Sequence, residues 1–182
     1  AEHIDPNSGV TVYTEIGEAS DEKHVLPALD VVLEKVRSRL GESSPILQSR
    51  NKPLLMATTP SLEALRAYSL GQQAKSERRL VDARNLNNTA IKLDPDFALA
   101  YVALGSLDLI ENDYPSAEKN WQLAERNRAR LSLREAMWLD ASSGIFSSPR
   151  IMLPKWKALA AMYPDEYSPY YNYAFFSMSN NL

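Results

Sequence analysis

The sequence predicts a mainly α protein in which a solenoid of repeated helix pairs follows a small α/β piece. Three observations support this prediction. Small and bulky residues recur with a period of 34 residues, Pro95 and Pro164 lie where the second helix of a pair would end, and short polar turns separate the helix-forming segments. The 182 residues are 45% apolar and 24% charged, a composition typical of a globular protein with a sizeable core.

The repeat is clearest over residues 64–131. We take Ala64 and Ala98 as position 1 of two successive units. Small residues then recur at positions 8, 20 and 27 of both units: Gly71, Ala83 and Ala90, then Gly105, Ala117 and Ala124. Bulky residues fall at position 7 of both units and at positions 4 and 24 of the second: Leu70 and Leu104, then Tyr101 and Trp121. Small residues let two antiparallel helices approach closely, and bulky ones fill the space between them. The period matches that of a tetratricopeptide (TPR) repeat, with units at 64–97 and 98–131.

Two further units are expected to follow. The third, over residues 132–166, is divergent. Trp156 falls at position 24 and Pro164 at position 32, but Asp140 and Met152 occupy positions 8 and 20, where small residues are expected. Its packing must therefore differ locally. Residues 167–182 fit the first helix of a partial fourth unit, whose second helix is expected beyond the end of the sequence.

A small α/β piece is expected over residues 1–43. Residues 4–14 combine a Pro-Asn-Ser-Gly turn with a β-branched and aromatic run, which predicts a hairpin with a truncated first strand. Apolar residues at helical spacing predict a helix over residues 25–40, with Pro27 in its first turn. Residues 44–60 lack this periodicity and are rich in polar residues and proline, which indicates a linker. The repeats are then expected over 61–182, with Ser61 as the first N-cap.

Several classes of function find no support in the sequence. The net charge is −3, and Lys and Arg are dispersed among Asp and Glu, so no direct nucleic acid partner is expected. Cysteine is absent and the two histidines are isolated, so we expect neither a metal site nor a cofactor. No nucleophile, phosphate-binding or dinucleotide-binding motif is present, so no catalytic residue is assigned and no enzymatic activity is expected. No stretch reaches the roughly 18 apolar residues of a membrane span.

Four segments carry a resemblance to a known family. Residues 37–43 (RSRLGES), 58–68 (TTPSLEALRAY), 92–95 (KLDP) and 130–138 (RLSLREAMW) resemble the TPR-containing sensory region of bacterial membrane-bound signalling proteins. In such proteins a cytoplasmic effector, commonly a Ser/Thr kinase, a winged-helix regulator or a nucleotide cyclase, is followed by a membrane span, a small α/β domain and a TPR array. The resemblance implies that a membrane span and an effector precede this chain in its parent protein, and that the chain is periplasmic.

The first helix of each TPR unit lines a concave groove in which ligands bind, through positions 2, 5, 9 and 12. These positions hold Leu65, Tyr68, Gln72 and Lys75 in the first unit, and Leu99, Val102, Ser106 and Leu109 in the second. Packing against neighbouring helices explains Tyr68, Leu99 and Val102 equally well. Gln72 and Lys75 are better candidates for contacts with a partner, because packing does not require them.

Aromatic residues gather near the C-terminus and include Tyr170, Tyr173 and Phe176. Aromatic side chains anchor many protein interfaces, so these three are candidates for an interface, including that of a homodimer. They are equally explained as core residues of the partial fourth unit. Charged clusters at 75–79 and 125–130 lie at helix ends, where solvated charge and interaction with the helix dipole are the usual explanation.

Two hypotheses of function follow. The first is a non-catalytic TPR module that binds a protein, peptide or other ligand and forms the extracytoplasmic sensor part of a membrane-bound signalling protein. The second is a soluble cytoplasmic TPR scaffold or chaperone-like adaptor. A membrane span upstream in the parent protein would distinguish the first from the second.

Overall fold

The computed structural model describes residues 2–4, 8–40 and 58–179. The chain divides into two compact units, Ala1–Leu62 and Glu63–Leu182, and each is described by itself. Most of the linker predicted at 44–60, and its boundary with residues 1–43, lie outside the described residues. That part of the domain prediction remains a prediction.

The described residues of the N-terminal unit that precede residue 41 form two short strands and one α-helix. Strand β1 (Glu2–Ile4) pairs antiparallel with β2 (Thr11–Thr14), with an irregular register between His3 and Ile4. Helix α1 (Val25–Arg39) covers the segment expected to be helical, and a single 3₁₀ turn, η1 (Glu22–His24), precedes it. Asp21 stabilises this start because its carboxylate accepts the backbone N–H of Lys23 at 2.9 Å.

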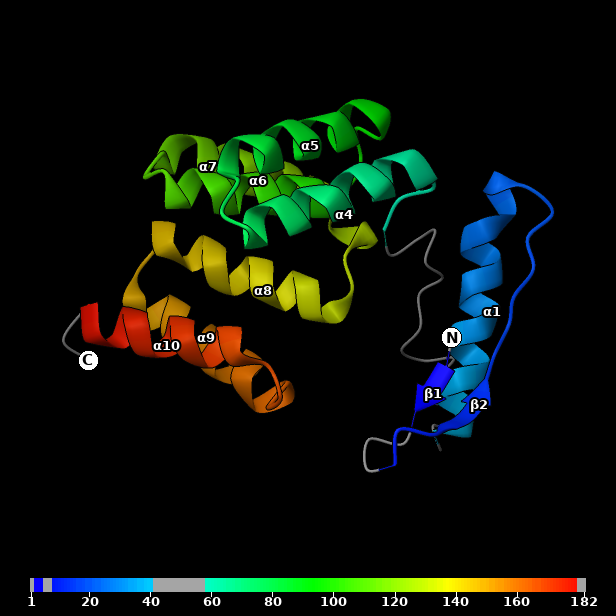
Figure 1. Cartoon of the computed structure of the whole chain (residues 1–182). Coiled ribbons are helices and arrows are strands. Elements are labelled where there is room, and N and C mark those ends of the chain that lie inside the picture. The colour runs from blue at the N-terminus through cyan, green and yellow to red at the C-terminus, as the bar shows by residue number, and fades with distance from the viewer. Residues whose placement is uncertain (1, 5–7, 41–57, 180–182) are drawn as a thin grey trace. The chain divides into compact units, whose positions relative to one another are not determined.

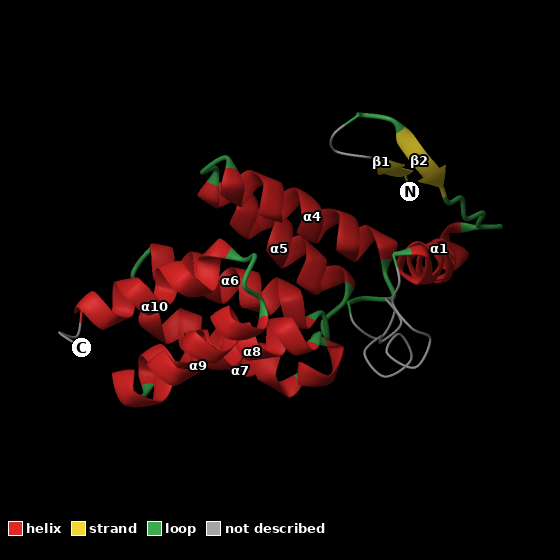
Figure 2. Ribbon diagram, turned by 90° about the horizontal axis from the view of Figure 1, so that it is seen from below, coloured by secondary structure: helices red, strands yellow, loops and turns green. Residues whose placement is uncertain are grey.

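The second unit is entirely helical among its described residues. Its seven α-helices are α4 (Leu62–Ser76), α5 (Leu80–Leu93), α6 (Ala98–Ile110), α7 (Tyr114–Arg126), α8 (Leu133–Ser143), α9 (Pro149–Met162) and α10 (Tyr167–Ser179). The 3₁₀ turns η2 (Arg128–Arg130) and η3 (Gly144–Phe146) lie at the two ends of α8. Helices α4 to α9 form sequential antiparallel pairs, and α10 packs on α9 (Figure 1; Figure 2 shows the same helices from below). The mainly α prediction is confirmed, as is the succession of helix pairs.

The backbone repeats at the period that the sequence predicts. After α4 and after α6 the chain turns through a residue with positive φ, Arg78 at 61° and Asn112 at 63°, which are 34 residues apart. The next N–H closes both turns: Arg79 donates to the Ala74 carbonyl at 2.9 Å, and Asp113 donates to Asp108 at 2.8 Å. The turn that joins the two helices of a pair is therefore the same structure in the first two units.

Glycine at position 8 allows the two helices of a pair to lie close together. A Cβ atom at Gly105 would overlap the indole Nε1 and Cδ1 of Trp121, which is at position 24. At Gly71 a Cβ would lie 2.8 Å from Nδ2 of Asn87, again at position 24. The predicted role of a small residue at position 8 is thus confirmed in both units.

In the divergent third unit, different residues allow the helices to pack closely. Met152 at position 20 is buried, and room for it comes from Gly144, whose Cβ would lie 2.8 Å from that of Met152. Asp140 at position 8 does not enter the helix interface. Its carboxylate binds both terminal nitrogens of Arg128, at 2.8 and 2.7 Å.

Leu70 departs from the prediction for position 7. Its equivalent Leu104 is 4% exposed and packs with Ala74 and Ala83 of the preceding pair, but Leu70 is 43% exposed. A bulky residue at position 7 therefore fills the space between successive pairs. Within Glu63–Leu182 no helix pair precedes α4, so the equivalent contact for Leu70 is missing.

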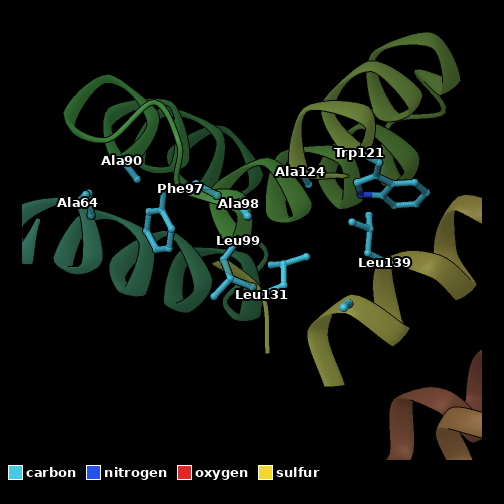
Figure 3. Packing of buried hydrophobic residues seen from close by; sticks show 12 residues of the cluster. Ala64, Ala90, Phe97, Ala98, Leu99, Trp121, Ala124, Leu131 and Leu139 are labelled. Atoms are coloured by element: carbon cyan, nitrogen blue, oxygen red, sulfur yellow. The ribbon is translucent and has the colours of Figure 1, made fainter. Parts of the chain in front are cut away.

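The main core joins the first, second and third pairs. Large apolar side chains meet between α4, α6, α7 and α8, and alanines lie among them (Figure 3). The large residues are Phe97, Leu99, Trp121, Leu131 and Leu139. Trp138, which the repeat positions did not single out, connects this cluster to the next. Its ring lies 6.1 Å from that of Trp121 and 6.0 Å from that of Trp156, edge to face in both contacts.

Asp108 is a buried carboxylate that connects three helices. Its Oδ1 lies 2.7 Å from Nη1 of Arg84 on α5, and its Oδ2 accepts a hydrogen bond from Nδ2 of Asn120 on α7 at 2.7 Å. Nη2 of Arg84 lies 2.7 Å from Glu111. Because each oxygen of Asp108 has a donor, the buried charge is compensated, and the network defines how α5, α6 and α7 meet.

We expect Gly105→Ala to destabilise the chain by about 1–3 kcal/mol, because the new methyl group would displace the buried ring of Trp121. Urea unfolding followed by circular dichroism measures the change. Gly71→Ala is the matched comparison at the same repeat position, and it should cost less, because only the amide end of Asn87 has to move rather than a buried indole ring, and alanine favours the helix. A Gly105→Ala chain that is as stable as the Gly71→Ala chain would contradict this account.

We expect Arg84→Met to cost about 3–5 kcal/mol, because it leaves the buried carboxylate of Asp108 without its cation. Arg79→Met is the control, since Arg79 also binds two carboxylates, those of Glu77 and Asp82, but on the exposed surface. The control should leave the free energy of unfolding nearly unchanged. Equal effects of the two substitutions in urea unfolding would refute the role given to Asp108.

Candidate functional site

The residues predicted to line a groove lie on α4 and α6, and we call their surface the candidate face. It comprises Leu65, Tyr68, Gln72, Lys75, Leu99, Val102, Ser106 and Leu109. The apolar members have packing roles. Leu99 is buried in the main core, and Leu65, Tyr68, Val102 and Leu109 pack against that core while remaining partly exposed. They form an apolar floor next to the polar members.

Tyr68 is held against the core and stays neutral. Its ring lies 5.2 Å from that of Phe97, which is fully buried. Burial raises the pKa of Tyr68 to about 12, and the nearby carboxylate of Glu135 on α8 acts in the same direction. The phenol is therefore protonated at any physiological pH and acts as a packing surface with a polar end.

Gln72 carries a buried donor that nothing satisfies. Its Nε2 is inaccessible to solvent and has no hydrogen-bond partner among the described residues. Ser106 at the equivalent position of α6 differs, because its hydroxyl donates to the carbonyl of Val102 at 2.9 Å. Buried side-chain atoms of Asn87, Ser142 and Trp156 also have no partner among the described residues, but of these residues only Gln72 lies at a predicted groove position. A buried donor without an acceptor costs free energy, and the partly buried side chain of Gln72 could turn its amide outward to a partner.

Lys75 lies one helical turn after Gln72 on the same side of α4. It is half-buried, and burial lowers the pKa of its ammonium group. Within the described part of the chain no carboxylate lies within ion-pair distance of it, in contrast to Arg79, Arg84 and Arg128. Two neighbouring donors on α4, one of them cationic, thus have no acceptor among the described residues.

The three predicted interface residues on α10 lie in different environments. Phe176 packs against the cluster of α8 and α9 that contains Trp156. Tyr170 is partly exposed, and its hydroxyl donates to the carbonyl of Ala160 at 3.2 Å. Tyr173 is 38% exposed. Phe176 and, in part, Tyr170 therefore hold α10 onto α9.

The aromatic residues that are most exposed on α10 belong to the aromatic group near the C-terminus, but they are not among the three residues singled out from it as interface candidates. Tyr167, Tyr171 and Phe175 follow each other at four-residue spacing, with ring centroids 5.7 and 6.1 Å apart. They form a continuous stripe on the outer side of the helix. The i, i+4, i+8 spacing was the signal that could have separated them from the inward-facing residues.

The charged cluster at 125–130 does more than interact with a helix dipole. Arg130 lies 2.7 Å from the carboxylate of Asp94, which is mostly buried in the turn between α5 and α6. Arg128 joins the end of α7 to Asp140 on α8. Explaining this cluster by solvated charge was therefore incomplete, because these arginines connect successive helix pairs. At 75–79 the exposed ion pairs of Arg79 agree with the solvated explanation.

A concave region lies between α7, α8, η3 and α9, with a volume of about 340 Å³. Glu125, Asp140 and Lys155 are among its lining residues. These charges already have partners: Arg128 binds both carboxylates, and Nζ of Lys155 donates to the Asp140 carbonyl at 3.1 Å. The region therefore offers a partner fewer unsatisfied polar groups than the candidate face does.

Comparisons with models of protein families, with characterised proteins and with solved structures gave no match. The described residues contain no group of three or more His, Asp or Glu side chains that could hold a metal ion. Among the described helices, none combines the length and the apolar character needed to cross a membrane.

The lowered pKa of Lys75 predicts a pH dependence of stability. Between that pKa and the ordinary value of 10.5 the unfolded chain binds more protons than the folded chain, so stability rises with pH. We expect the free energy of unfolding of the wild type to rise relative to that of Lys75→Met as the pH is raised toward 10.5. Lys92→Met, at an exposed lysine of α5, should follow the wild type. Parallel curves for the wild type and Lys75→Met would exclude a desolvated ammonium.

Proposed function

We propose that this chain is a TPR-type interaction module that binds a protein or peptide partner on the candidate face and carries out no catalysis itself. The helix pairs, the 34-residue recurrence of the turns and the glycine contacts at position 8 support a TPR assignment of the fold. A rigid array of this kind binds through the face that its first helices present.

The observation that carries the proposal is the pair of unsatisfied donors on α4. In the free chain Gln72 Nε2 has no acceptor and Lys75 has no counter-ion among the described residues. Leaving these groups desolvated lowers the stability of the free chain, and an acceptor supplied by a partner would reverse that loss. The partner best suited to this face presents a carboxylate beside apolar side chains, which would cover Tyr68, Val102 and Leu109.

We further propose, from the resemblance of the sequence, that the module is the extracytoplasmic sensor part of a membrane-bound bacterial signalling protein. Occupancy of the candidate face would then bias an effector on the other side of the membrane. The alternative is a cytoplasmic scaffold or chaperone-like adaptor, for which the same face would tether a partner. Fractionation of cells that express the parent protein, with protease added to intact spheroplasts, distinguishes an extracytoplasmic from a cytoplasmic location.

We expect peptides selected on the wild-type chain from a random display library to contain an acidic residue next to apolar ones. Binding measured by calorimetry should weaken about ten- to hundredfold in Lys75→Met, since hydrogen bonds to charged groups contribute about 1.5–3 kcal/mol. Gln72→Leu should weaken binding by a smaller factor, because its lost hydrogen bond is neutral.

Two matched variants control this experiment. Gln73→Leu changes the neighbouring glutamine, which is exposed and donates to Glu77 at 3.0 Å, and Lys92→Met changes an exposed lysine of α5. Both should bind the selected peptides as the wild type does. Peptides that bind Lys75→Met as tightly as the wild type, or a selection that enriches no peptide, would refute the candidate face as the binding site.

A further inference from the structure

Helix α10 presents an aromatic surface that the other described residues of its unit do not cover. Tyr167, Tyr171 and Phe175 form the stripe described above, Met178 continues it, and Tyr170 flanks it. Opposite this surface, Pro169 and Phe176 face α8 and α9. From Tyr167 to Ser179 the helix contains no charged residue. An exposed surface of this kind is characteristic of an interaction site.

The repeat register indicates that Tyr171 and Phe175 do not face toward a second helix of their own unit. With Tyr167 as position 1 they occupy positions 5 and 9, like Tyr68 and Gln72 on α4. In the first two units the contact with the second helix is made by position 8, which is Ala174 on α10. The centre of the stripe therefore faces away from the side on which position 8 meets a second helix.

We propose that this surface binds its own counterpart on a second copy of the chain, so that two α10 helices pack antiparallel about a two-fold axis. An uncharged aromatic surface is compatible with its own image, because no like charges meet and offset rings can interdigitate. Tyr171 is the middle ring of the stripe, so the axis passes close to it and each Tyr171 faces the other. This proposal does not depend on binding at the candidate face on α4.

The area available agrees with a dimer of moderate affinity. The exposed fractions are 76% for Tyr167, 48% for Tyr170, 51% for Tyr171, 51% for Phe175 and 79% for Met178. If a fully exposed side chain of this size has an area of about 200 Å², the exposed area of these five side chains is about 600 Å² in one copy and about 1,200 Å² in a pair. Specific interfaces bury about 1,200–2,000 Å², so the pair lies at the lower end of that range.

Sedimentation equilibrium over a concentration series tests the proposal. We expect the wild type to pass from monomer to dimer as its concentration rises, and Tyr171→Lys and Tyr171→Glu each to remain monomeric through like-charge repulsion. An equimolar mixture of these two variants should form the dimer again, because the two introduced charges attract across the axis. A change in the fold of each chain alone would not produce this recovery.

Tyr114→Lys is the matched control, since Tyr114 on α7 is 48% exposed and lies outside the stripe. It should dimerise as the wild type does. The proposal is overturned if the wild type stays monomeric at every concentration, if Tyr171→Lys alone still dimerises, or if the mixture of charged variants stays monomeric.

Discussion

At position 8 of the first two repeat units a glycine lies against the side chain at position 24 of the second helix, and this contact determines how closely the helices of a pair approach. Trp121 occupies the space beside Gly105, and from there its ring reaches Trp138 and Phe146 on the next pair. A bulkier residue at position 8 would move the ring and, with it, the packing of α8. The close approach inside one pair thus determines where the following pair can lie.

Directional interactions then select one arrangement of the closely packed helices. Apolar contacts between alanine-rich helices tolerate small rotations, whereas the carboxylate of Asp108 needs Arg84 from α5 and Asn120 from α7 at the same time. Arg130 similarly joins the end of α7 to Asp94. These networks satisfy Asp94 and Asp108, two of the buried polar residues of the array. Gln72 and Lys75 are outside them and lie at predicted groove positions, which is why we propose that they act on a partner.

Structural features that depend on one residue type at one position could be predicted from the sequence. Features that depend on two residues from different parts of the chain could not. Gly71 and Gly105 showed the repeat because a Cβ atom at either position would crowd the side chain at position 24. In the third unit the close approach is made by Gly144, which leaves room for Met152 at position 20. Because the prediction looked for a small residue at position 8, it could not reveal this different arrangement. The partners of Arg128 and Arg130 come from other helices, so their structural role appears only after folding. On α10 the aromatic residues were expected, but which of them face outward depends on the orientation of the helix on α9.

The two proposed surfaces differ in the physics of recognition. Lys75 and Gln72 discriminate between partners. A partner without a correctly placed acceptor leaves both groups desolvated, which costs free energy, and it gains no hydrogen bond from them. The stripe around Tyr171 offers apolar area, which favours association in proportion to the surface covered. A chain with both surfaces can therefore select its partner at α4 and bring two copies together at α10. If binding at α4 changes how α8 and α9 support α10, the two events become coupled, and the strength of dimerisation then reports on occupancy of the candidate face.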